Sequence, residues 1–319
     1  PAECGPACLS LCQDVQGETF EYPEEFFKER IHNIRRPRPD DFQIKQAVEK
    51  IKNSKKPIII SGGGVFYSDA MDELGNFAIK HNIPVTQTVM GYSTMKKDHS
   101  HFVGPIGGLG GKAANNLAKE TDLAICIGTK LADFTTGSWA NFENPEFKLV
   151  SINIARHDAN KHLAEAVIGD AKVTLTELSN AIGDWKSSDS WHKKSQVELK
   201  SWNEYVDKES GPTNQELPSY AHAVGAIYRN SDPTDIAVTA AGGLVGEVVQ
   251  VWRPKELNTH ETEWGFSCMS YEISGALGIK MANPDKDVIA FVGDGSYLLN
   301  NSDIYSSVIT NNKLIIIVC

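Results

Sequence analysis

The residues with the clearest chemical meaning lie near the C-terminal end of the sequence. The apolar run Val288–Val292 leads directly into Gly293-Asp294-Gly295-Ser296, and a second apolar run ends the chain at 314–319. This pattern predicts a βαβ unit with a Gly-Asp-Gly turn after its first strand. An aspartate there could hold Mg²⁺ on a bound phosphate, because Mg²⁺ takes one or two carboxylates plus phosphate oxygens. The glycines would let the backbone approach that phosphate closely. An ordinary loop between a strand and a helix could carry the same residues.

Two earlier segments of the same region also fall after or between predicted strands. The first, 239–244, contains Gly242-Gly243, and a glycine pair at a helix N-terminus offers backbone N–H groups to a phosphate. The second, 264–272, contains Met269 and precedes a helix of small residues that starts near Ile273. Open α/β sheets bind ligands beyond the carboxyl ends of their strands. We therefore expect the three loops to lie at one edge of a sheet.

In order and spacing, the three loops resemble the diphosphate-binding domain of the thiamine-diphosphate-dependent enzymes. The resemblance implies that Gly243 and Leu244 contact the diphosphate of the cofactor. It implies that Met269 supplies a backbone contact and an apolar prop to the aminopyrimidine ring. It assigns the remaining contacts with the diphosphate and Mg²⁺ to the third loop, which consists of Gly293, Asp294, Gly295 and Ser296. In this loop Asp294 is the metal ligand. In the family, the second metal ligand is an Asn just past the next strand. The resemblance therefore implies that this sequence, which ends at Cys319, is a fragment cut just before that ligand.

Three further stretches, 5–16, 133–139 and 265–272, resemble the branch of this family that acts in inositol catabolism, so the resemblance covers nearly the whole chain. It implies a hydrolase that uses thiamine diphosphate and Mg²⁺ to cleave a carbon–carbon bond in a polyhydroxylated cyclic 1,2-diketone. It also implies a homodimer or higher oligomer, because the active site of the family forms between two subunits. The activating glutamate of the family is expected upstream of Pro1. No catalytic residue is therefore assigned here, and the chain alone is expected to be inactive.

Two alternatives remain open. One is another thiamine-diphosphate enzyme, a 2-oxo-acid lyase or carboligase such as acetolactate synthase. The other is a non-catalytic nucleotide-binding regulator that would use Gly62-Gly63-Gly64, a triplet after a predicted strand. That triplet is not Gly-x-Gly-x-x-Gly, and no acidic residue clearly closes a second strand. The pattern favours a structural turn over a nucleotide site.

Two polar groups near these loops have no settled role. His260, Glu261 and Glu263 could face a polyhydroxylated substrate or form a solvated turn. The segment 133–139 could contact the substrate, but its pattern favours a structural role in a loop of the central domain.

The elements that must position these loops alternate between apolar strands and amphipathic helices. This alternation predicts an α/β fold with parallel sheets and helices on both faces, in the multidomain architecture of the thiamine-diphosphate enzymes. Asp40-Asp41 is expected to cap a helix over 42–51. The predicted strands are 58–61, 83–88, 123–128, 149–154, 236–239, 288–292 and 314–318.

The domain prediction follows from these elements and from the resemblance. A polar segment containing Trp185, Trp191 and Trp202 predicts a connecting helix whose tryptophans pack on neighbouring domains. The predicted divisions are 1–17, the tail of a pyrimidine-binding domain; 18–40, a linker; 41–183, a central Rossmann-like domain whose nucleotide site is vacant; 184–216, the connecting segment; and 217–319, a diphosphate-binding domain truncated at its C-terminus.

Composition excludes several classes of protein. The net charge of −10 and the pI near 5.4 argue against a nucleic-acid partner. No run of 18 apolar residues exists, so no membrane-spanning helix is expected. The six cysteines are scattered without zinc spacing. We expect them to be buried, reduced thiols without disulfides, in a cytoplasmic protein.

Overall fold

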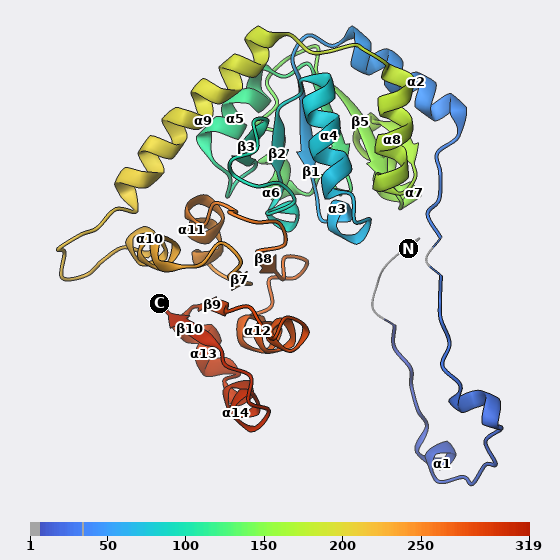
Figure 1. The fold of residues 1–319 in the computed structure, drawn as a ribbon, viewed down its shortest axis with the longest axis vertical. Helices are drawn as coiled ribbons and strands as arrows, with labels where there is room; N and C mark the ends of the chain where they lie inside the picture. The colour runs from blue at the N-terminus through green and yellow to red at the C-terminus, as the bar shows by residue number, and fades with distance from the viewer. Residues whose placement is uncertain (1–6, 34) are drawn as a thin grey trace.

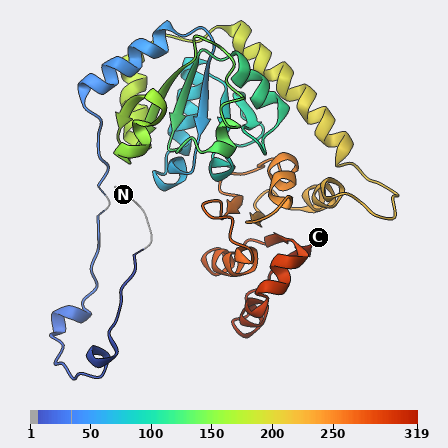
Figure 2. The same cartoon turned by 180° about the vertical axis from the view of Figure 1, so that it is seen from behind.

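Two parallel β-sheets form the body of the molecule, with helices packed on both faces of each (Figure 1, Figure 2). The computed structural model describes residues 7–33 and 35–319, so Cys4 and the start of the 5–16 stretch lie outside the described residues. One sheet has six strands and the other has four. The predicted α/β class with parallel sheets is therefore confirmed.

The larger sheet has the strand order β3-β2-β1-β4-β5-β6, and all its neighbouring strands run parallel. Its chain moves outward from β1 on one side and later returns to the other side of β1, so its topological switch point lies between β1 and β4. The strands are β1 (Pro57–Ser61), β2 (Val85–Gln87), β3 (Phe102–Pro105), β4 (Leu123–Ile127), β5 (Lys148–Asn153) and β6 (Glu165–Ile168). The accompanying helices are α2 (Asp41–Asn53), α3 (Gly64–Tyr67), α4 (Met71–His81), η2 (Val89–Gly91), α5 (Lys112–Glu120), α6 (Asp133–Thr136), α7 (Arg156–Ala159), η3 (Lys161–Leu163), α8 (Ala171–Ile182) and α9 (Asp189–Glu209).

Strand β1 shows why an uninterrupted apolar run predicts a central strand here. Ile58 and Ile60 belong to an apolar cluster with residues of α5 and α9, whereas Ile59 belongs to a cluster with residues of α2, α4 and α8. Successive side chains of a strand point to opposite faces, so a strand covered on both faces needs apolar residues at every position. Each such buried side chain contributes about 1.5–3 kcal/mol. Asp40 caps α2 as predicted, because its side chain accepts the Gln43 N–H at 2.8 Å.

The smaller sheet has the strand order β10-β9-β7-β8, again with every neighbouring pair parallel. From β7 the chain passes to β8 on one side and then to β9 on the other, so the switch point lies between β7 and β9. Helices α10 and α11 cover one face and α12 covers the other, with α14 packed against α12. The elements are α10 (Tyr220–Asn230), β7 (Ile236–Thr239), α11 (Leu244–Val251), β8 (His260–Thr262), α12 (Tyr271–Ala282), β9 (Val288–Val292), α13 (Asp294–Leu299), α14 (Ser302–Ile309) and β10 (Ile315–Val318).

Helix α9 confirms the prediction that tryptophans of the connecting segment pack on neighbouring elements. Trp191 and Trp202 are buried, and the Trp191 indole N–H donates to the Pro57 carbonyl oxygen at 2.8 Å. Both rings belong to an apolar cluster that also contains Leu244 and Val248 of α11. One continuous core therefore joins the two sheets through α9.

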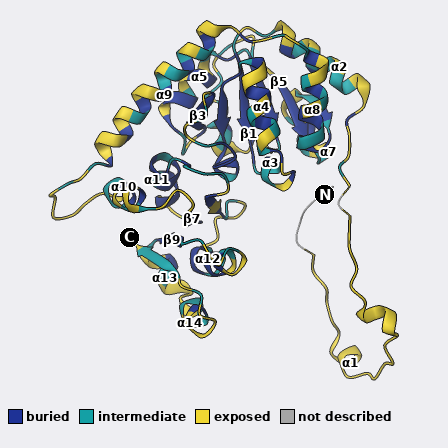
Figure 3. Ribbon diagram, in the orientation of Figure 1, coloured by how far each residue is buried: buried dark blue, intermediate teal, exposed yellow. Residues whose placement is uncertain are grey.

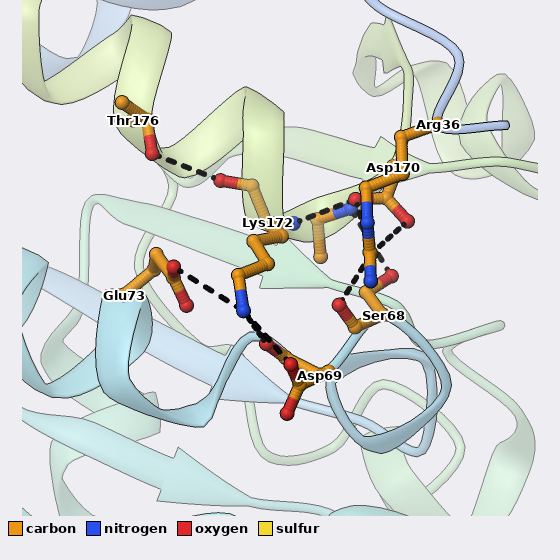
Figure 4. A network of polar contacts seen from close by, with 8 residues as sticks. Arg36, Ser68, Asp69, Glu73, Asp170, Lys172 and Thr176 are labelled. Carbon is orange, nitrogen blue, oxygen red and sulfur yellow. Dashed lines mark hydrogen bonds and ion pairs between the residues drawn. The ribbon is translucent and has the colours of Figure 1, made fainter. Parts of the chain in front are cut away.

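The segment just before α2 is fixed to the central sheet by polar contacts around the N-terminus of α8 (Figure 4). The Arg36 guanidinium lies 3.0 Å from both carboxylate oxygens of Asp170, which is fully buried, and donates to the Ser68 carbonyl oxygen at 2.5 Å. Beside this pair, the Lys172 ammonium lies 2.8 Å from the Asp69 carboxylate. Without Arg36, the buried charge of Asp170 would have no partner, which is costly. The pair therefore anchors this end of the segment to the central sheet.

Residues 7–33 form an extended arm outside the body of the molecule (Figure 1, Figure 3). The arm carries two short helices, α1 (Gln13–Gln16) and η1 (Glu24–Phe27), and all of its residues are exposed. Phe20, Tyr22, Phe26 and Phe27 contact one another there, with ring centroids 5.1–6.1 Å apart. The predicted assignment of 1–17 to a separate domain stays a prediction.

The five cysteines among the described residues are all free thiols. The expectation that they are buried is wrong for Cys8, Cys12 and Cys268, which are exposed, and holds for Cys126. The first two lie on the extended arm and Cys268 lies in a surface loop, which explains their exposure. Across residues 7–33 and 35–319, no helix has the length and apolar character required to cross a membrane.

Candidate functional site

The three loops singled out in the sequence lie at one edge of the smaller sheet. Strands β7, β8 and β9 are parallel neighbours, so the loops that follow them leave from the same side. The loops after β7 and β9 flank the switch point, where open α/β sheets bind ligands. The structure therefore brings together the segments around Gly243, Met269 and Asp294, as predicted.

The first loop presents an open backbone at the start of α11. Gly242 has a φ of 77°, a conformation that favours glycine, and a Cβ added to Gly242 or Gly243 would have no atom within 4 Å. Leu244 begins the helix, but its side chain is buried in the core that joins the sheets. Any contact of Leu244 with a ligand is therefore restricted to its backbone N–H, one of the groups that a helix N-terminus leaves without an internal partner.

The third loop presents an exposed carboxylate at the start of α13. Asp294 is the first residue of this helix, and its Oδ1 accepts the Gly295 N–H at 2.7 Å. Its own N–H donates to the Cys319 carbonyl oxygen at 3.2 Å, which ties the turn to the end of β10. Gly293 has open space where a Cβ would stand, whereas the Ser296 side chain is buried. The loop can thus offer the Asp294 carboxylate and backbone N–H groups to a ligand.

The second loop touches the third through Met269. A Cβ added to Gly295 would lie 3.4 Å from the Met269 Cε, so the methionine side chain stands beside the Gly-Asp-Gly turn. Met269 is 48% exposed, which leaves half of its surface for contact with a ligand. The loop ends at Ser270, whose φ of 72° is left-handed, immediately before α12.

Glu272 joins the first and second loops and was not found from the sequence. Its carboxyl group is fully buried, and Oε1 accepts the Ala241 N–H of the first loop at 3.2 Å. Burial raises the pKa of Glu272, although backbone N–H groups including those of Ala241 and Ser270 oppose the rise. Its Oε2 is buried without a hydrogen-bond partner. The signal in the sequence that could have revealed Glu272 was a single acidic residue at the start of a helix of small and apolar residues.

The polar group before the second loop forms a strand and not a solvated turn. His260 and Thr262 are buried in β8, and the His260 ring packs edge-on against Tyr92 with centroids 5.4 Å apart. Glu261 is exposed on β8, beside a cleft of about 400 Å³ between the two sheets. Glu263 turns back on the loop, and its carboxylate accepts the Phe266 N–H at 2.9 Å.

The segment 133–139 shapes a loop of the central sheet, as its pattern favoured. The Phe134 ring packs edge-on against Trp264 with centroids 5.0 Å apart, and the Phe134 carbonyl oxygen accepts the Gly108 N–H at 2.7 Å. Trp264 directly precedes the second loop. The contact therefore links the central sheet to the candidate site without placing these side chains in it.

The glycine triplet of the central sheet, in contrast, is packed against its own fold. The Gly62 and Gly64 N–H groups donate to the carbonyl oxygens of Ile127 and Gly128, at 2.8 Å and 2.9 Å. A Cβ on Gly62 would lie 2.4 Å from the Gly128 oxygen. These contacts support the structural interpretation of the triplet, because two of its N–H groups are already engaged.

The donors at the edge of the smaller sheet fit a Mg²⁺-bound diphosphate. A carboxylate oxygen is a preferred Mg²⁺ ligand, and the phosphates of the ligand normally complete the shell. Among residues 7–33 and 35–319, no group of three or more His, Cys, Asp and Glu side chains is placed to hold a metal alone. The open glycines at 242, 243 and 293 provide a cradle that side chains would fill. Asp294 therefore suits a metal that arrives with its phosphates.

Family comparisons agree with this geometry. The model of the thiamine pyrophosphate enzyme central domain matches residues 44–178, and the model of the C-terminal TPP binding domain of these enzymes matches residues 240–319. Together the matches cover more than half of the chain. The chain belongs to the thiamine pyrophosphate enzyme family.

Individual relatives point to one branch. Proteins named 3D-(3,5/4)-trihydroxycyclohexane-1,2-dione hydrolase are similar to 98% of this chain: that of Clostridium perfringens (strain 13) at 37% identity, that of Clostridium botulinum (strain Alaska E43) at 38%, and that of Bacillus anthracis at 39%. The chain spans about half the length of these relatives, 52–53%.

Proposed function

We propose that the whole protein is a thiamine-diphosphate- and Mg²⁺-dependent hydrolase of myo-inositol degradation. It would cleave a carbon–carbon bond of 3D-(3,5/4)-trihydroxycyclohexane-1,2-dione to give 5-deoxy-glucuronate. The observation that carries the proposal is the meeting of three loops at the switch point of the smaller sheet, with open glycines and an exposed Asp294. The relatives, which bear the name of this hydrolase, support the choice of substrate.

In this proposal each loop has a separate task. Asp294 would hold Mg²⁺, and Gly243, Leu244, Gly295 and Ser296 would contact the diphosphate, with Gly293 allowing its close approach. Met269 contacts the aminopyrimidine through its backbone and supports the cofactor through its side chain. When bound, thiamine diphosphate supplies a nucleophilic carbon and an electron sink for the breaking carbon–carbon bond. The residues of this chain thus bind and orient, and the activating glutamate is expected from the pyrimidine-binding domain.

The divisions of the chain enter the proposal in the same way. We assign 1–17 to the tail of the pyrimidine-binding domain, 18–40 to a linker, 41–183 to the central domain, 184–216 to the connecting segment and 217–319 to the diphosphate-binding domain. A homodimer or higher oligomer would complete the active site. The free thiols support a cytoplasmic location.

The test is turnover by the whole protein with thiamine diphosphate and Mg²⁺. We expect ring opening of the cyclic diketone, complete dependence on both additions, and no condensation of pyruvate. Activity on pyruvate without activity on the diketone would replace the hydrolase by a carboligase such as acetolactate synthase. Activity that persists after removal of thiamine diphosphate and Mg²⁺ would contradict the proposal as a whole.

A further inference from the structure

The loop that carries Met269 is not held in place by burial. Residues 265–269 are all exposed, and Phe266 is 91% exposed. Ser267 and Ser270 have φ values of 54° and 72°, in the left-handed region that costs residues with a side chain about 1–2 kcal/mol each. A surface loop with a strained backbone and no buried anchor needs polar contacts to keep one conformation.

The Glu263 carboxylate provides these contacts from the end of β8. Its Oε1 accepts the Phe266 N–H at 2.9 Å, and its Oε2 accepts the Cys268 N–H at 2.5 Å. Hydrogen bonds to an ionised acceptor are about twice as strong as neutral ones. Burial opposes ionisation of Glu263, but the bonds from Phe266, Cys268 and Gly265 outweigh it and lower its pKa. The side chain thus acts as an anion that holds two alternate N–H groups of the loop.

We propose that Glu263 is a positioning residue, whose carboxylate fixes the loop that presents Met269 to the cofactor. This inference rests on the proposed function. Met269 directly follows Cys268, and its Cε stands beside Gly295 of the Gly-Asp-Gly turn. The conformation of the loop therefore sets where Met269 lies relative to the metal-binding turn. Helix α12, with Glu272 buried in its first turn, fixes the far end of the loop, so Glu263 controls the near end.

The first test is the affinity of the whole protein for thiamine diphosphate with Mg²⁺, measured by calorimetric titration. Glu263→Ala removes both acceptors and should weaken binding about 10-fold or more. Glu263→Gln keeps one acceptor oxygen and should weaken binding less, by about 3-fold. The matched control is Glu261→Gln, which removes the same charge two residues earlier on β8. Its affinity should stay within about 2-fold of the unsubstituted protein, because Glu261 does not contact the loop.

The second test reads the loop without the cofactor, through the exposed thiol of Cys268. Partial desolvation raises the pKa of this thiol, and the negative charge of Glu263 adds to the rise. Glu263→Ala and Glu263→Gln should therefore increase the rate of Cys268 alkylation by iodoacetamide at pH 8 about 3-fold or more, because the thiolate is the reactive form. Peptide mapping separates Cys268 from the other exposed cysteines. The urea unfolding midpoint, if unchanged, shows that general unfolding does not cause the increase.

The outcomes separate the two claims. If the unsubstituted protein binds no thiamine diphosphate, the proposed function is wrong, and the positioning role with it. If it binds, but Glu263→Ala leaves the affinity unchanged, the positioning role alone is wrong, whatever the reactivity of Cys268. The positioning role is supported if both Glu263 variants bind the cofactor more weakly and react faster at Cys268, while Glu261→Gln changes neither property.

Discussion

The two sheets use glycine in opposite ways at their carboxyl edges. Each has a glycine-rich turn between a strand and a helix beside its switch point, after β1 in one sheet and after β7 in the other. At the first, Gly62 and Gly64 pack against the backbone of Gly128, and an added Cβ would lie 2.4–2.6 Å from its atoms. At the second, Gly242 and Gly243 face open space.

The difference shows that glycine after a strand has two separate structural uses. It can let two backbones of the same fold touch, or it can leave a backbone open to a ligand. In the central sheet the first use engages N–H groups that a phosphate would need. In the smaller sheet the second use comes together with an exposed carboxylate at Asp294. The candidate site therefore lies in the smaller sheet, although both turns have similar residues.

The largest effect should come from adding a methyl group at the closed edge. Gly62→Ala places Cβ against backbone atoms that cannot move away, so we expect a loss of about 3 kcal/mol or more in the free energy of unfolding. Urea denaturation of the whole protein measures this loss. Gly243→Ala is the matched control, with a change below about 0.5 kcal/mol, because it meets no atom within 4 Å and has a helical φ of −69°. Equal stability of the two variants would remove the contrast.

The same Gly243→Ala variant should behave differently in binding. Its methyl group would occupy the space through which we propose the diphosphate approaches, so affinity for thiamine diphosphate should fall about tenfold, or 1.4 kcal/mol. Calorimetric titration measures the change. Unaltered affinity would show that the open space at Gly243 is not part of the cofactor site.

A smaller effect concerns the stability of the protein at acidic pH, and it should arise from one histidine in or beside each sheet. Burial lowers the pKa of His101, beside the central sheet, and of His260, in β8, each to about 4. For His101 the charges of His192 and His99 add to this effect. Both imidazoles stay neutral in the folded state, whereas the unfolded chain binds protons below about pH 6.5. Their contribution to stability is therefore complete above pH 6.5 and is lost as the pH falls toward 4.

This contribution should be on the order of 1–2 kcal/mol for each histidine between pH 7 and pH 5. Urea midpoints at several pH values measure it, and His101→Gln should reduce the pH dependence without removing the share of His260. A midpoint that rises on acidification over this range would contradict the assignment of both groups.

Strands with a continuous apolar run were predictable from the sequence, and three short strands were not. The run at Ile58–Ile60 predicts β1 because both faces are covered, and the runs in β4, β5, β7, β9 and β10 follow the same rule. Strands β3, β6 and β8 were missed. In β8, His260 and Thr262 are polar, and their burial depends on pairing with β7 and on Tyr92, which is distant in the sequence.

The site divides in the same way. The first and third loops were predictable because each follows an apolar strand and carries glycine, whereas the second was recognised by its residues and by the helix that it precedes. The contacts of Glu263 with the loop and of Glu272 with Ala241 depend on how side chains fold back in space, so spacing alone could not reveal them. The closed state of the Gly62 turn likewise became visible only through its distance to Gly128.

The most direct test of the central claim is titration of the whole protein with thiamine diphosphate in the presence and absence of Mg²⁺. The account predicts Mg²⁺-dependent binding that Asp294→Ala weakens by at least about 100-fold, because the variant lacks the metal-binding carboxylate. Asp287→Asn, at the opposite end of β9 from the three loops, should bind like the unsubstituted protein. Retained affinity in Asp294→Ala would contradict the claim that the edge of the smaller sheet holds the metal and its diphosphate.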